Sequence, residues 1–104
     1  MTRPEALPAA AVTAAVAELP HWDGDTQGIY RRLEFPSFRA AVDAVARIAD
    51  VAEEMDHHPD LDIRYDTVRV SVATHSAGGV TELDLELARR VDALFGADPA
   101  DPAG

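Results

Sequence analysis

The fold is decided by residues 37–72, SFRAAVDAVARIADVAEEMDHHPDLDIRYDTVRVSV. In the first half, apolar residues recur at helical spacing over about five turns, which predicts an amphipathic helix that begins after Ser37 and ends before Pro59. This apolar set is Phe38, Ala41, Val42, Val45, Ile48, Ala49, Ala52 and Met55. In the second half, apolar and polar residues alternate over 61–65 and again over 68–72. That period predicts two strands, or one bent strand, directly after the helix.

The flanking segments complete the predicted order of elements. Residues 9–19 are rich in alanine and end at Pro20, which predicts a first helix. Residues 21–25 predict a short strand and turn, residues 28–35 a strand with one polar face, and Thr81 is placed to cap a last helix. The order α-β-β-α-β-β-α lacks strand–helix alternation. It therefore predicts an α+β fold, an antiparallel four-stranded sheet with helices packed on one face.

Length and composition narrow the class of protein. The chain has 104 residues, enough for one hydrophobic core, so we expect a single domain over 1–104 with flexible tails at 1–8 and 97–104. A formal charge of −10 argues against nucleic acid and anionic membranes as partners. Cysteine is absent, which excludes disulfides and thiolate sites and fits a cytoplasmic location. All basic residues are arginine, which we interpret as a sign of a GC-rich bacterial genome.

Histidines at the ends of predicted elements are the candidates for chemistry. Glu53 and His57 are four residues apart on the predicted helix, so the carboxylate could orient the imidazole. A solvated surface pair fits the same spacing. Adjacent His57 and His58 point in different directions, although imidazolium also favours helix C-termini without any catalytic role. His75 follows the valine-rich strand, away from its apolar face. Asp84, three residues after the predicted cap, fits a capping box.

These residues together resemble the signature of a known enzyme family. Glu53-x-x-x-His57-His58-Pro59, then Thr74-His75, then Gly78-Gly79-Val80-Thr81 and Asp84, occur in the order and spacing of the pterin-4a-carbinolamine dehydratases. The similarity extends from about Leu19 through Phe95. One departure is Leu61, where members of the family commonly carry an aromatic residue. The resemblance therefore implies an altered wall of the pterin pocket.

The resemblance implies a hydro-lyase that removes water from 4a-hydroxytetrahydropterin, such as 4a-hydroxytetrahydrobiopterin, to give quinonoid dihydropterin in tetrahydrobiopterin recycling. No cofactor and no metal are implied. The implied catalytic residues are His57, His58 and His75, with His57 and His75 as the acid/base pair, because histidine can donate or accept a proton near neutrality. Glu53 would orient His57, and His58 would mainly hold the pterin. The implied substrate-binding residues are Glu53, Asp56, His58, Thr74, Ser76 and Asp84.

The resemblance also implies a homo-oligomer, a tetramer made of two dimers. Pairing edge strands across a two-fold axis would cover the unpaired edges of so small a sheet, and Thr67 to Thr74 is expected to be that edge because it carries few charges. Two other readings stay open. The family includes non-catalytic dimerisation cofactors of transcription factors, and related folds act as assembly factors. A zinc hydrolase could use three histidines and two carboxylates, although the helical His spacing of zincins is absent.

Overall fold

The predicted order of elements is confirmed in a computed structural model of the chain, which describes residues 4–96. Its elements are α1 (Ala9–Ala17), β1 (Asp23–Asp25), β2 (Gly28–Glu34), α2 (Phe38–Met55), β3 (Asp60–Arg64), β4 (Thr67–Val72), the short 3-10 helix η1 (His75–Ala77) and α3 (Glu82–Phe95). The α+β class is likewise confirmed. The predicted tail at 97–104 lies outside the described residues.

The four strands form one antiparallel sheet in the order β1-β2-β4-β3. The expectation that Thr67 to Thr74 forms the edge strand is wrong, because β4 pairs with β2 on one side and with β3 on the other. Its low charge has a different cause. Val68, Val70 and Val72 are buried under the helices, and a central strand has no free edge that charges must protect. The edges of the sheet are β1 and β3.

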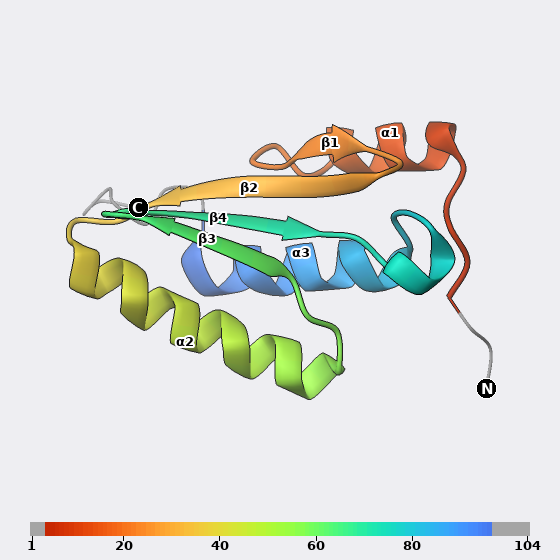
Figure 1. Cartoon of the computed structure of the whole chain (residues 1–104). Helices are drawn as coiled ribbons and strands as arrows, with labels where there is room; N and C mark the ends of the chain where they lie inside the picture. Colours follow the sequence, from red (N-terminus) through yellow and green to blue (C-terminus); the bar gives the residue numbers. More distant parts are fainter. Residues whose placement is uncertain (1–3, 97–104) are drawn as a thin grey trace.

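One face of the sheet carries the hydrophobic core. Ile29 and Leu33 of β2 and the valines of β4 form a single cluster with residues of all three long helices, among them Val12, Ile48 and Leu87. Helices α2 and α3 lie below the sheet in Figure 1. On the opposite face, the residues of β2 and β4 are exposed or half-buried. Within residues 4–96, no helix is both long and apolar enough to cross a membrane.

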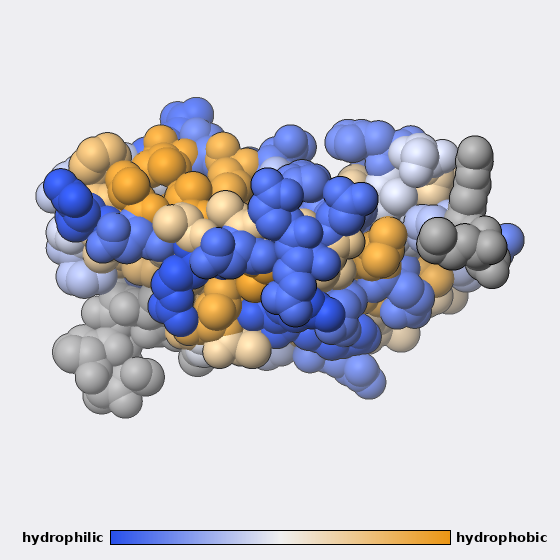
Figure 2. Space-filling view, turned by 90° about the horizontal axis from the view of Figure 1, so that it is seen from below, coloured by the Kyte–Doolittle hydropathy of each residue, from blue (hydrophilic) through white to orange (hydrophobic). Residues whose placement is uncertain are grey.

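Helix α2 starts at a side-chain cap and buries only part of its apolar stripe. The Ser37 hydroxyl accepts a hydrogen bond from the Ala40 N–H at 3.0 Å. The buried residues of the helix are Ala41, Ala44, Ile48 and Ala52. Phe38 and Val42, which belong to the predicted stripe, are 54% and 40% exposed. Figure 2 shows hydrophobic residues gathered at the end of the molecule where α2 begins. The stripe is therefore wider than the surface that the sheet and α3 cover.

A buried arginine ties the sheet to the far end of α3. Arg31 lies on the core face of β2, 2% exposed, and its guanidinium donates to Asp92 Oδ1 and to the Gly96 carbonyl, each at 2.5 Å. The Trp22 indole N–H donates to the same Asp92 oxygen at 2.8 Å. Because the Asp92 carboxylate carries the opposite charge, it compensates the buried charge of Arg31.

The segment before α1 packs against the rest of the protein through Leu7. The Leu7 N–H donates to the Val80 carbonyl at 2.8 Å, and the Leu7 side chain packs against the core. Residues 4–8 belong to the segment that was expected to form a flexible tail. The hydrogen bond at Leu7 brings this segment beside Val80, which immediately precedes the cap of α3.

Candidate functional site

The candidate residues meet at the end of the sheet where β4 leaves it and α3 begins. Thr74 follows β4, and a backbone bridge joins it to Gly79. At Gly79 a Cβ atom would lie 2.5 Å from the carbonyl oxygen of Thr26, so any larger residue would force the backbone apart. Gly78 has a φ of 79°, a conformation that glycine adopts without strain. The Gly78-Gly79 pair of the sequence therefore has a structural role, because it lets the chain turn tightly between Thr74 and Thr81.

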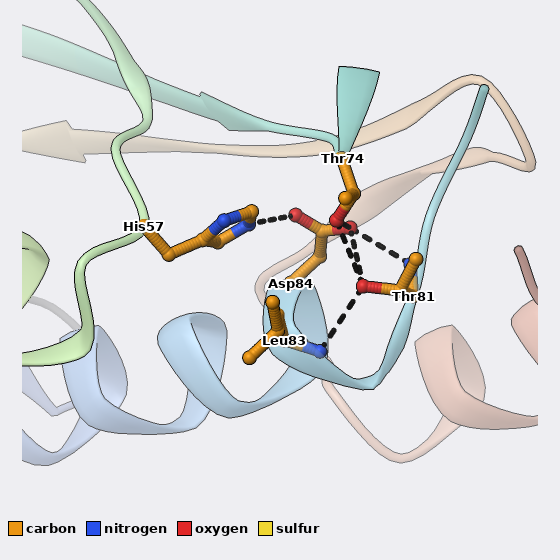
Figure 3. A network of polar contacts seen from close by, with 5 residues as sticks. All are labelled: His57, Thr74, Thr81, Leu83 and Asp84. Atoms are coloured by element: carbon orange, nitrogen blue, oxygen red, sulfur yellow. Dashed lines mark hydrogen bonds and ion pairs between the residues drawn. The ribbon is translucent and has the colours of Figure 1, made fainter. Parts of the chain in front are cut away.

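Asp84 is the centre of a buried hydrogen-bond network (Figure 3). Its side chain is fully buried, and its Oδ2 accepts from the Thr81 N–H and from the Thr74 hydroxyl, both at 2.8 Å. The Thr81 hydroxyl lies 2.8 Å from that of Thr74 and accepts the Leu83 N–H at 3.2 Å. The capping box predicted from the spacing is therefore present, and it extends to the end of β4 through Thr74.

His57 supplies the remaining contact of the Asp84 carboxylate. Its Nε2 lies 2.6 Å from Asp84 Oδ1, and its side chain is 11% exposed. The end of α2 fixes this position. Asp56 adopts the left-handed conformation with a φ of 50°, and the His57 N–H reaches back to the Ala52 carbonyl at 3.0 Å. This C-terminal turn ends the helix before His57 and directs the chain toward α3.

The structure gives Glu53 a different partner from the predicted one. Glu53 Oε2 lies 3.4 Å from His58 Nε2, with the two side chains 77% and 58% exposed. The expectation that Glu53 orients His57 is wrong, because the helix ends at Asp56 and the i, i+4 relation no longer holds for His57. Asp84 is the residue that orients His57. The pair of Glu53 and His58 is largely solvated and contributes little to stability.

Three further predicted residues are exposed around this network. His75 and Ser76 lie in η1, directly after Thr74, and Asp56 lies at the end of α2. Among residues 4–96, the His75 side chain makes no hydrogen bond or ion pair. The structure therefore joins His57, Thr74 and Asp84 directly, and leaves His58, His75 and Ser76 as exposed side chains on the adjoining segments. Thr81 was predicted as a cap, and its contact with Thr74 was missed.

A metal centre has no ligand set in the described part of the chain. Over residues 4–96, no group of three or more His, Asp or Glu side chains is placed to hold a metal ion. Asp84 Oδ2 is already occupied, because it accepts hydrogen bonds from the Thr74 hydroxyl and the Thr81 N–H. What the arrangement offers chemically is an imidazole held by a buried carboxylate, beside exposed imidazoles that a ligand can reach.

Comparisons with known proteins show which family and fold this chain shares. The family model described as pterin 4 alpha carbinolamine dehydratase matches residues 5–94. A protein of Mycobacterium tuberculosis (strain ATCC 25618 / H37Rv), which carries that enzyme's name provisionally, is 46% identical over 86 residues, or 83% of this chain and 92% of the relative. A provisionally named relative from Mycolicibacterium smegmatis is 45% identical over 84 residues, covering 81% of this chain and 89% of the relative.

Solved structures share the fold. A transcriptional coactivator/pterin dehydratase from Brucella melitensis superposes with a TM-score of 0.81 at 37% identity, covering 86% of this chain and 98% of that one. A pterin dehydratase-like protein identified as a RuBisCO assembly factor in the alpha-carboxysome has a TM-score of 0.59 at 24% identity, covering 74% and 89%. That second likeness concerns the fold alone. From the match over residues 5–94, this chain belongs to the pterin 4 alpha carbinolamine dehydratase family.

Proposed function

We propose that this protein is a pterin-4a-carbinolamine dehydratase that eliminates water from 4a-hydroxytetrahydropterin and leaves quinonoid dihydropterin. The observation that carries the proposal is the 2.6 Å contact between His57 Nε2 and the fully buried Asp84 carboxylate. A buried carboxylate of this kind fixes both the orientation and the tautomer of an imidazole.

The network supports one tautomer of His57. Asp84 Oδ2 accepts from the Thr74 hydroxyl and from the Thr81 N–H, and an ionised carboxylate can only accept. Oδ1 then accepts from His57, so Nε2 carries the hydrogen. In neutral His57 the lone pair lies on Nδ1, which makes no hydrogen bond within residues 4–96. Nδ1 is therefore the atom through which His57 takes or gives a proton.

The reaction requires two proton transfers. The C4a–O bond breaks as the lone pair of the adjacent ring nitrogen forms a C=N bond, one group protonates the departing oxygen to give water, and another removes the ring N–H proton. We assign these roles to His57 and His75. His58, Glu53, Asp56, Ser76 and the groups at Thr74 would hold the pterin. Asp84 would act through His57, as a positioning residue.

The assembly that we propose is a homo-oligomer, a dimer of dimers, in the cytoplasm. Phe38 and Val42 leave an apolar strip on α2 that water would otherwise contact, and a second copy of the strip would cover it. The two outer strands offer further unpaired backbone groups for a dimer. An assembly of this kind would also suit the alternative function, a non-catalytic cofactor or assembly factor on the same fold.

The decisive experiment measures dehydration of freshly generated 4a-hydroxytetrahydropterin with and without the protein. We expect the protein to accelerate the spontaneous reaction in proportion to its concentration. The matched control is His21→Ala, which removes an exposed histidine outside the site and should leave the rate unchanged. If the wild-type protein gives no acceleration while it binds pterin, the non-catalytic alternative holds instead.

A further inference from the structure

A pocket lies on the open face of the sheet, at the end opposite to the candidate site. It has a volume of about 340 Å³ and is lined by Arg32, Asp62, Arg64, Thr67 and Arg69. Strand β4 passes through both regions, because it begins at Thr67 beside this pocket and leads to Thr74 in the candidate site. In Figure 1 this is the end of the sheet where β2 finishes and β4 starts. The two sites therefore do not share residues.

The register of the sheet places positive charges next to each other in this pocket. Arg32 of β2 lies directly opposite Arg69 of β4, and Arg69 lies opposite Asp62 of β3. Like charges at directly opposite positions destabilise a sheet. Three arginines and one aspartate give the lining residues a charge of +2, in a chain with a formal charge of −10.

Within residues 4–96, Arg32 and Arg69 make no ion pair with a carboxylate of the protein, whereas Arg64 does. Arg64 Nε donates to Asp62 Oδ2 at 3.2 Å, which uses the carboxylate in the pocket. The Arg69 guanidinium lies over the Tyr30 ring, 4.3 Å from its centroid, so that its N–H edge remains available. Within residues 4–96, the Arg32 side chain has no ion pair or hydrogen bond. Two guanidinium groups on neighbouring strands thus present N–H donors without acceptors.

We propose that this pocket binds a small phosphate-bearing anion. Guanidinium groups donate paired N–H bonds to phosphate oxygens, and a bound anion between Arg32 and Arg69 would replace their repulsion by two attractions. The volume is in the range of pockets that hold small organic ligands. A long polyanion such as nucleic acid fits poorly, because the positive charge is local and the rest of the surface would repel it.

The test is a titration of the ¹⁵N-labelled full-length protein with inorganic pyrophosphate, followed by NMR. We expect saturable shifts at residues of the pocket, and affinity that falls as sodium chloride is raised. Arg32→Gln and Arg69→Gln should each weaken binding by roughly tenfold, whereas Arg39→Gln, which removes an exposed arginine of α2, should not. Shifts that do not saturate, or equal affinity in the Arg32→Gln variant, would overturn the proposal.

Two further experiments test which chemical class of anion the pocket prefers and whether binding there depends on the candidate site. Citrate tests whether carboxylates suffice; binding as tight as that of pyrophosphate would contradict the phosphate class proposed here. His57→Ala should bind pyrophosphate like the wild type, because His57 lies at the other end of β4. The proposal therefore stands or falls independently of the dehydratase activity.

Discussion

His57 and Asp84 are 27 residues apart in the chain, yet their side chains meet at 2.6 Å across the gap between the end of α2 and the start of α3. The carboxylate belongs to the capping box of α3, so one side chain both starts a helix and holds an imidazole. The stability of the helix end and the orientation of His57 are therefore coupled.

Removing either proposed acid/base residue should abolish most of the catalysis. His57→Ala and His75→Ala are each expected to lower kcat by about 10² or more, the usual contribution of a positioned proton donor or acceptor. Circular dichroism should show that both variants stay folded, and His21→Ala serves as the control. A folded double variant with the wild-type rate would remove these residues from the mechanism.

Asp84→Asn should separate positioning from folding. The amide oxygen of asparagine still accepts hydrogen bonds, but its NH₂ must then face either His57 or the donors at Thr74 and Thr81. We therefore expect a loss of about 1–3 kcal/mol in the free energy of unfolding. The ¹⁵N chemical shifts of the His57 ring should report a change of tautomer, together with a fall in kcat. Glu53→Gln should leave those shifts unchanged, since its partner is His58.

Thr74 provides a finer test of the same network. Thr74→Val removes the hydroxyl that donates to Asp84 Oδ2, whereas Thr74→Ser keeps it. We expect the valine variant to lose about 1–2 kcal/mol of stability and to lower kcat, because a buried acceptor and the Thr81 hydroxyl lose a partner. The serine variant should restore kcat and the ¹⁵N shifts of His57. Equal behaviour of the two variants would show that the hydroxyl does not act through Asp84.

Leu61→Trp should tighten pterin binding. The resemblance noted from the sequence implies an aromatic ring at the position of Leu61, which lies half-buried on edge strand β3 opposite Val70. A recovered stacking surface would strengthen binding by roughly 0.5–1.5 kcal/mol, measurable by titration with a stable pterin. Weaker or unchanged binding would mean that this position does not contact the ring.

Association of the oligomer should become stronger as the salt concentration is raised. Because the chain carries a formal charge of −10, copies repel one another at low salt, and screening should tighten the assembly as salt is raised. Sedimentation at two salt concentrations measures this directly. Val42→Asp, on the exposed strip of α2, should weaken association, whereas Arg39→Gln should not. A wild-type protein that stays monomeric at micromolar concentration in both salts would contradict the proposed tetramer.

The elements of the fold could be predicted because each leaves a local pattern. The helical period of α2, the alternation of β3 and β4 and the box of Thr81 and Asp84 all depend on residues close in sequence. Long-range partners leave no such pattern. The pairing of His57 with Asp84 depends on a left-handed residue at Asp56 that ends α2, and nothing in the spacing of Glu53 and His57 reveals it.

The same limit explains the misplaced edge strand and the unexpected Arg31. A lack of charge is shared by a central strand and by an edge that pairs with another copy, so it could not place β4. Arg31 alternates with Ile29 and Leu33 on the buried face of β2, a position in which an arginine needs a partner. That partner, Asp92, lies 61 residues away and could be identified only from the structure.

The two ends of α3 are held by different parts of the molecule, and this determines where the protein can open. Arg31 and Trp22 grip the last turn through Asp92, while the first turn is joined to β4 and to the end of α2. Because both ends of α3 are held, the helix cannot move away from the sheet without breaking one of these sets of contacts. We therefore expect η1 and the connection between α2 and β3 to open more readily than α3, so that their amides should exchange with deuterium much sooner than those of α3.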